Sequence, residues 1–123
     1  MVALFVGRFQ PFHLGHLKVL EYVSRVVDRI IIGVGSSQEK NTLENPFSYE
    51  ERLEMITSSL RLDRKKYAVL PIPDFGDEKR WVEHVLKNMP TFDVVYTSAP
   101  REKRIFRNAG VTVRSVPLYD RSV

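Results

Sequence analysis

The sequence predicts an α/β fold, a doubly wound, Rossmann-like parallel sheet of about five strands with helices on both faces. Five short apolar runs are spread along the chain, and a segment with helical periodicity separates each run from the next. The runs are continuous rather than alternating, as expected for strands that helices cover on both sides. No repeat or low-complexity linker interrupts the 123 residues, so residues 1–123 are expected to form a single domain.

The first two predicted strands frame a helix and are followed by a polar loop. Val2–Val6 and Arg29–Val34 are apolar runs, and residues 14–26 between them repeat apolar positions at helical spacing. Residues 36–47 form the loop. The apolar positions expected to face the core from the first helix are Leu17, Leu20, Val23 and Val26.

A capping box predicts where the second helix begins. Ser48 is an N-cap residue type and Glu51 follows it by three positions, so each side chain can satisfy a backbone N–H of the other. The helix is expected to reach about Leu60 and to bury Leu53, Ile56 and Leu60.

The rest of the chain continues the same alternation. Strands are expected at Tyr67–Leu70, Phe92–Tyr96 and Val111–Val116, and helices at Glu78–Asn88 and Pro100–Asn108. Proline is well placed in the first turn of a helix, where its missing N–H would have no partner.

Composition excludes several classes of function. The chain has no cysteine, which excludes disulfides, thiolate catalysis and cysteine metal sites. No apolar run approaches the roughly 18 residues that span a bilayer, and no secretory signal is evident, so a cytoplasmic location without membrane contact is expected. The net charge is +4, but the basic residues are interspersed with acidic ones and not with aromatic ones, so no nucleic-acid partner is expected.

The passage Gly7–His16 carries most of the functional signal. It places an arginine, two glycines and two of the three histidines at a strand-to-helix turn. Such a turn gathers backbone N–H groups at a positive helix end and suits phosphate binding. Gly15 allows close approach of an anion, and Arg8 can bind a phosphate with its planar guanidinium. Alternatively, His13 and His16 only pack at the turn. A zinc site would need His84 as third ligand, so metal binding by the protein itself is not expected.

A strand followed by H-x-G-H at the start of a helix resembles the nucleotidyltransferase superfamily. The longer segment Gly7–His16 is similar to the nicotinamide mononucleotide adenylyltransferases of archaeal type. Gly33–Gln38, Asn45–Arg52, Trp81–His84 and Asp93–Tyr96 resemble later segments of that family, in the same order.

The resemblance implies transfer of AMP from ATP to nicotinamide mononucleotide, giving NAD and pyrophosphate. It implies a catalytic role for four residues, His13, His16, Arg8 and Arg52, with Arg52 contacting phosphate. The implied ATP-binding residues are Gly7, Arg8, Phe9, His13, Gly15 and His16. The implied acceptor-binding residues are Phe9, Gln10, Ser36, Ser37, Arg52, Asp74 and Trp81, with the indole stacking on the nicotinamide ring. Mg²⁺ would arrive with ATP, bound mainly through its phosphates, and the relatives suggest a homo-oligomer, a hexamer.

Several of these residues have structural alternatives. Trp81 lies on an amphipathic pattern, for which a core position is the alternative. Arg52 can pair with Glu50 or Glu54 on a helix face, and Ser36 and Ser37 can satisfy turn backbone.

The match departs from the family at three places, of which two are small: residues 76–80 before the tryptophan and residues 97–100 after Tyr96 differ from the family's usual residues. The family's later S-x-T-x-[IV]-R segment has no counterpart before the sequence stops at Leu118–Val123. Two other functions therefore stay open: an adenylyltransferase with another phosphorylated acceptor, FMN or phosphopantetheine, and a non-catalytic nucleotide-binding domain. The first is disfavoured because relatives of that kind usually begin with a G-T-F-D segment.

Overall fold

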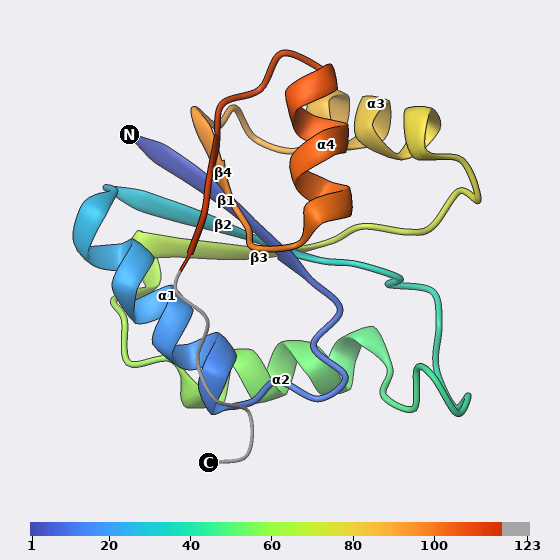
Figure 1. The fold of residues 1–123 in the computed structure, drawn as a ribbon. Helices are drawn as coiled ribbons and strands as arrows, with labels where there is room; N and C mark the ends of the chain where they lie inside the picture. The colour runs from blue at the N-terminus through green and yellow to red at the C-terminus, as the bar shows by residue number, and fades with distance from the viewer. Residues whose placement is uncertain (117–123) are drawn as a thin grey trace.

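Five parallel strands form one sheet in the order β3-β2-β1-β4-β5, with helices on both faces (Figure 1). The computed structural model describes residues 1–116. The strands are β1 (Val2–Gly7), β2 (Arg29–Val34), β3 (Tyr67–Pro71), β4 (Val94–Tyr96) and β5 (Val113–Arg114). The helices are α1 (Leu14–Val26), α2 (Tyr49–Ser59), the short 3₁₀ turn η1 (Arg64–Lys66), α3 (Glu78–Asn88) and α4 (Pro100–Asn108).

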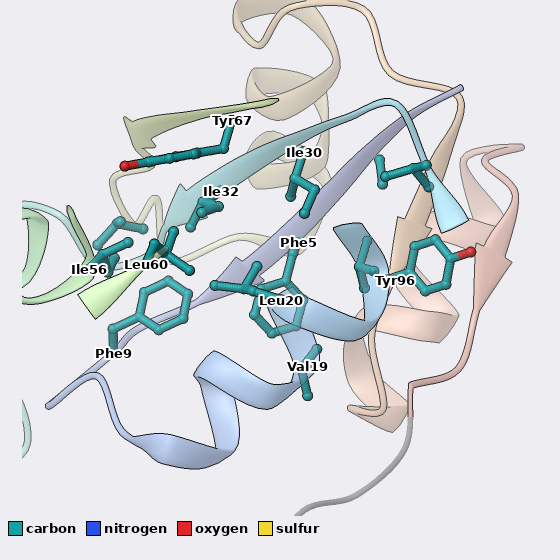
Figure 2. Close-up of a cluster of buried hydrophobic side chains, with 14 of the residues drawn as sticks. Phe5, Phe9, Val19, Leu20, Ile30, Ile32, Ile56, Leu60, Tyr67 and Tyr96 are labelled. Atoms are coloured by element: carbon teal, nitrogen blue, oxygen red, sulfur yellow. The ribbon is translucent and has the colours of Figure 1, made fainter. Parts of the chain in front are cut away.

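The sheet separates two apolar clusters, because neighbouring residues of a buried strand point to opposite faces. Ala3 and Phe5 of β1 face α1 and α2, together with Leu20, Val23 and Ile56 of those helices. Figure 2 shows this cluster, with the Phe9, Ile56 and Leu60 side chains gathered beside Ile32. The alternate residues Leu4 and Val6 face α3 and α4, where Val85, Ile105 and Phe106 pack against them. The continuous apolar runs therefore reflect burial on both faces, and the predicted fold class is confirmed.

The ends of several elements differ from the prediction. β4 begins at Val94 and not at Phe92, and β5 is reduced to Val113–Arg114. β3 continues into Pro71, because a strand at the edge of a sheet tolerates proline. The predicted capping box at Ser48 is present, with both reciprocal bonds to Glu51. The missing S-x-T-x-[IV]-R motif concerns residues 118–123, which lie outside the described residues.

Two side chains face differently from the prediction. Val26 was expected in the core but is 47% exposed, and Val27, at the end of α1, is buried instead. On α2, Arg52 is fully buried, whereas the neighbouring Leu53 is only half-buried. Polar contacts of Arg52, described below, account for its inward position.

The strand order reverses direction between β1 and β4. Successive crossovers place α1 and α2 on one face of the sheet and α3 and α4 on the other, so the two directions part between β1 and β4 (Figure 1). Open α/β sheets bind ligands at the carboxyl ends of the strands at this point. Within residues 1–116, no helix combines the length and apolar character needed to cross a membrane.

Candidate functional site

Two cavities open at the carboxyl ends of β1 and β4. The first, here called the histidine cavity, has a volume of about 420 Å³ and is lined by the turn Phe9–His16 and by Thr97 and Ser98. The second, the tryptophan cavity, has a volume of about 570 Å³ and is lined by Asp74–Glu78 and Trp81. Both share five lining residues, Val6, Gly7, Arg8, Ala99 and Glu102. Two ligands bound in them would therefore meet beside Arg8.

A tight turn follows β1 and gives the histidine cavity its floor. Phe9 has a positive φ of 53° and a ring that is only 2% exposed. A Cβ on Gly7 would lie 2.8 Å from Cζ of that ring, so the turn requires glycine there. The Phe9 ring meets the His16 ring edge-on, with centroids 4.8 Å apart, and thereby fixes the imidazole.

His13 and His16 cap the helix α1 with their own rings. Nδ1 of His13 accepts a hydrogen bond from the Gly15 backbone N–H, and Nδ1 of His16 accepts one from the His13 backbone N–H, both at 3.1 Å. The two rings stack with centroids 3.7 Å apart. Because Nδ1 is an acceptor in both, the proton of each neutral ring lies on Nε2. The two imidazoles stand beside the first turn of a helix, a place that suits phosphate oxygens.

Three hydrogen bonds tie the loop after β2 to the turn after β1. The Gln10 side-chain amide donates to the Phe47 carbonyl and accepts from its N–H, at 3.0 and 2.9 Å, and the Gly35 N–H donates to the Gly7 carbonyl at 2.8 Å. Both amide atoms of Gln10, predicted to contact substrate, therefore hold the 36–47 loop in place, although the residue also lines the histidine cavity.

Arg52 lies beneath the site and lines neither cavity. Its side chain is fully buried, and burial lowers the pKa of the guanidinium from its ordinary value. The guanidinium nitrogens donate to six backbone carbonyls, the shortest bond being 2.8 Å to Gly35. The acceptors belong to Arg8, Gly35, Ser36, Ser37, Glu39 and Ser48. This geometry differs from the predicted phosphate contact, because the donors are directed at the loops that form the site. We infer that Arg52 positions these loops.

The tryptophan cavity collects three of the seven predicted acceptor-binding residues, whereas Phe9 and Gln10 line the histidine cavity and Arg52 lines neither. Ser36, Asp74 and Trp81 line it, whereas Ser37 lines neither cavity and donates its N–H to the Ile72 carbonyl. The Trp81 indole is half-buried and packs edge-on against Phe106, with centroids 5.7 Å apart. The tryptophan therefore has both a packing contact and a surface on the cavity.

Glu102, which the sequence did not single out, lies where the cavities meet. It is half-buried in the first turn of α4 and accepts a hydrogen bond from Thr97 Oγ1 at 3.1 Å. Burial raises the pKa of this carboxyl, and the Thr97 hydrogen bond partly opposes the rise. The position of Glu102 could have been predicted from the topology, because the first turn of the helix after β4 lies beside the ends of the other strands.

Replacing Glu102 with glutamine is expected to change how stability depends on pH. Because folding raises the pKa, this carboxyl contributes stability below its unfolded value of about 4.5 and loses that contribution as the pH rises through the folded value. The Glu102→Gln variant should therefore become more stable relative to wild type across that rise and stay so at neutral pH. Urea unfolding between pH 4 and 8 measures the difference, with the exposed Glu83→Gln as control. An equal pH profile for Glu102→Gln and wild type would contradict this account.

Comparison with known proteins finds relatives that match almost the whole chain. A family model described as cytidylyltransferase-like matches residues 4–88. The nicotinamide-nucleotide adenylyltransferase of Archaeoglobus fulgidus is 45% identical over 129 aligned positions, which cover 99% of this chain and 74% of that protein. The chain belongs to the nicotinamide-nucleotide adenylyltransferase family. The family's member from Thermoplasma volcanium is also 45% identical, with 98% of this chain and 68% of the relative covered. The predicted resemblance is confirmed.

Solved structures of other proteins have the same fold as this chain. A bifunctional NMN adenylyltransferase/ADP ribose pyrophosphatase from Francisella tularensis, in complex with AMP and a manganese ion, superposes with a TM-score of 0.78 at 29% identity. The match covers 97% of this chain but only 37% of that one, so the family domain is one part of the bifunctional protein. A lipopolysaccharide core biosynthesis protein from Thermoplasma volcanium has a TM-score of 0.64 at 20% identity, a likeness of fold alone.

Proposed function

We propose that this chain transfers the adenylyl group of ATP to nicotinamide mononucleotide, giving NAD and pyrophosphate. The observation that carries the proposal is the pair of adjoining cavities, one with the histidine donors and one with Trp81, that meet at Arg8. An enzyme that joins two nucleotides needs two such sites with a common boundary. Membership of the adenylyltransferase family supports the same reaction.

The histidine cavity is the proposed ATP site. The Nε2–H groups of His13 and His16 would donate to the phosphate oxygens, and Gly15 leaves room for them at the first turn of α1. Arg8 is exposed and lines both cavities, so its guanidinium can contact the phosphates of both substrates. Gly7 and Phe9 hold this turn in shape.

The tryptophan cavity is the proposed mononucleotide site. The indole of Trp81 would stack on the nicotinamide ring, while Ser36 and Asp74 offer polar groups to the remainder of the nucleotide. Gln10 would contribute to this site indirectly, because its two hydrogen bonds to Phe47 hold the 36–47 loop in place.

The proposed reaction needs positioning more than acid–base chemistry. An oxygen of the mononucleotide phosphate attacks the α-phosphorus of ATP, and the bond from that phosphorus to the bridging oxygen breaks. The pyrophosphate leaves with the electron pair. The nucleophile is already an anion, so no general base is required. His13, His16 and Arg8 would hold two anions in line and stabilise the charge that spreads over the transferred group.

Mg²⁺ is the proposed metal partner of ATP. Among residues 1–116, no group of three His, Cys, Asp or Glu side chains is placed to hold a metal ion. The available donors therefore fit an ion that keeps phosphate and water ligands, as Mg²⁺ prefers. When bound, it would neutralise charge on the phosphates, and Glu102 is the described carboxylate that lines both cavities.

The reaction is tested by incubating the chain with ATP, Mg²⁺ and nicotinamide mononucleotide and following NAD with a coupled dehydrogenase. NAD formation is expected. If none forms, FMN and phosphopantetheine are tried as acceptors, with pyrophosphate release as the readout. ATP binding without any product would favour the alternative of a non-catalytic nucleotide-binding domain.

Replacing Trp81 with alanine should weaken mononucleotide binding about tenfold or more and leave ATP binding unchanged, because aromatic stacking on a base contributes roughly 1–3 kcal/mol. Titration calorimetry with each ligand measures both affinities. The Trp81→Phe variant keeps an aromatic face and should retain most of the affinity. Equal losses for the two ligands would instead indicate that the indole acts through its contact with Phe106.

Three further expectations stay predictions. They are a cytoplasmic location, the absence of nucleic-acid and membrane partners, and assembly into a homo-oligomer, a hexamer by family resemblance. Sedimentation of the purified chain tests the last of these.

A further inference from the structure

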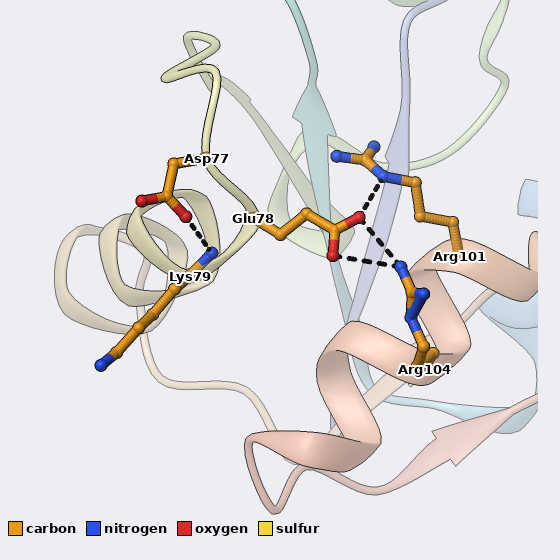
Figure 3. Close-up of polar contacts among 5 residues, drawn as sticks. All are labelled: Asp77, Glu78, Lys79, Arg101 and Arg104. Atoms are coloured by element: carbon orange, nitrogen blue, oxygen red, sulfur yellow. Dashed lines mark hydrogen bonds and ion pairs between the residues drawn. The ribbon is translucent and has the colours of Figure 1, made fainter.

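An ion-pair cluster joins the first turn of α3 to the first two turns of α4 beside the tryptophan cavity. Glu78 Oε2 accepts from Nε of Arg101 at 2.8 Å, and both carboxylate oxygens accept from Nη2 of Arg104, at 3.1 and 2.9 Å. Figure 3 shows the Glu78 carboxylate between the two guanidinium groups of α4. The three side chains together carry one net positive charge.

The backbone on either side fixes where this cluster lies. Asp77 caps α3, its Oδ1 accepting from the Lys79 N–H at 2.9 Å, so the helix begins at Glu78 (Figure 3). The two helices pack through Trp81 and Phe106. All three charged side chains are about half exposed or more, and exposed ion pairs contribute little to stability. A contribution to the stability of the fold therefore does not explain why these three side chains are arranged in this way.

Arg101 and Arg104 differ in where they point. Arg101 lines the tryptophan cavity, and its chain neighbours Ala99 and Glu102 lie at the junction with the histidine cavity; Arg104 lines neither. Arg101 uses Nε for Glu78, and over residues 1–116 its two terminal nitrogens have no hydrogen-bond acceptor. In Figure 3 these nitrogens are directed away from Glu78. A guanidinium held by one edge, with two donors remaining, matches the geometry of a phosphate.

The charge of the tryptophan cavity favours such a contact. Its lining contains four acidic residues, Asp74, Asp77, Glu78 and Glu102, but only two cations, Arg8 and Arg101. Asp77 is engaged at the helix cap and Glu78 with the arginines, which leaves Asp74 and Glu102 to repel an incoming anion. With Arg8 alone, a phosphorylated acceptor would meet a net negative wall.

We propose that Arg101, oriented by Glu78, binds the phosphate of the acceptor mononucleotide in the tryptophan cavity. The inference rests on the proposed function in that it takes the tryptophan cavity as the acceptor site. It assigns Arg101 as a substrate-binding residue and Glu78 as the residue that positions it. Discrimination should be for a phosphorylated acceptor over its dephosphorylated form.

The single tryptophan of the chain, Trp81, provides a binding signal that does not depend on turnover. Fluorescence titrations compare nicotinamide mononucleotide with nicotinamide riboside, which lacks the phosphate. Arg101→Gln should weaken binding of the mononucleotide about tenfold to a hundredfold and leave that of the riboside unchanged, as expected for loss of a charge-assisted hydrogen bond. Arg104→Gln removes the same charge from the same cluster and should change neither affinity by more than about twofold.

Glu78→Gln tests the positioning role separately. It keeps Arg101 but weakens the contact that orients it, so mononucleotide affinity should fall by less than in Arg101→Gln, and the double variant should resemble Arg101→Gln alone. Equal effects of Arg101→Gln and Arg104→Gln, or equal losses for mononucleotide and riboside, would overturn the inference.

The outcomes also separate this inference from the proposed function. If wild type makes NAD but Arg101→Gln has an unchanged KM for the mononucleotide, the function stands and the inference fails. If wild type makes no NAD, the titrations are repeated with FMN and riboflavin. Loss of phosphate discrimination in Arg101→Gln with that pair would support the inference without the proposed acceptor, and an absence of discrimination in wild type with both pairs would overturn it.

Discussion

Replacing Arg52 with methionine is expected to lower the free energy of unfolding by at least about 3 kcal/mol. The side chain is fully buried, and its donors satisfy six backbone carbonyls from three segments. Methionine keeps an unbranched apolar chain but has no donor, and each buried polar group left without a partner costs roughly 1–3 kcal/mol. Because a domain of this size has about 5–15 kcal/mol of stability in total, the loss should be evident in urea unfolding.

Two companion variants show whether the loss of stability comes from the charge of Arg52, from its planar donors or from its buried position. Arg52→Lys keeps the charge but lacks the planar array of donors, so it should recover only part of the lost stability. Arg61→Met removes an exposed arginine just after α2 and should leave the unfolding midpoint nearly unchanged. A stable Arg52→Met protein with a greatly raised KM for ATP would contradict the buried position and favour the phosphate contact that the sequence predicted.

The second large effect is expected at His16. Replacing it with alanine removes a proposed phosphate donor, the ring stacked on His13 and the acceptor for the His13 N–H. Loss of one preorganised donor to a transition state lowers the rate by on the order of 10²–10³. We therefore expect kcat/KM for ATP to fall at least about a hundredfold in the His16→Ala variant, as measured by NAD formation.

A glutamate at the same position distinguishes helix capping from phosphate binding. Glutamate is the usual residue at the third helical position of a capping box, so His16→Glu should keep the start of α1 intact. Its negative charge would repel the triphosphate, so ATP binding and turnover should be lost while the unfolding midpoint stays near that of wild type. Substantial turnover in His16→Glu would rule out the proposed contact with ATP phosphate.

The sequence correctly predicted those helix starts that depend on a few adjacent residues. The capping box at Ser48 and the first turn at Pro100 depend on a few adjacent residues, and both are present. β5 is shorter than its apolar run because only Val113 and Arg114 pair with β4, at the edge of the sheet. Pairing depends on a distant strand, which a run of apolar residues does not reveal.

The site was predictable where a motif marks it and not where packing creates it. The histidines are recognisable because their spacing and the strand before them carry the signal. The inward direction of Arg52 is different, since its acceptors are carbonyls of segments up to 44 residues away. Charged residues on a helix usually face solvent, so only the assembled loops show that this one is buried. Glu102 and Arg101 likewise gain their position from the approach of α4 to the end of β1.

The two apolar clusters divide the molecule in a way that bears on how substrate choice can evolve. The histidine cavity rests mainly on α1 and its side of the sheet, whereas the walls of the tryptophan cavity come from the starts of α3 and α4. Five residues at the junction line both cavities, and the other residues of each cavity line that cavity alone. With the two sites assigned as proposed, substitutions at residues of α3 and α4 that line only the tryptophan cavity, such as Trp81, are expected to alter the acceptor while ATP remains the donor, which makes them the first positions to vary when redesigning which molecule is adenylylated.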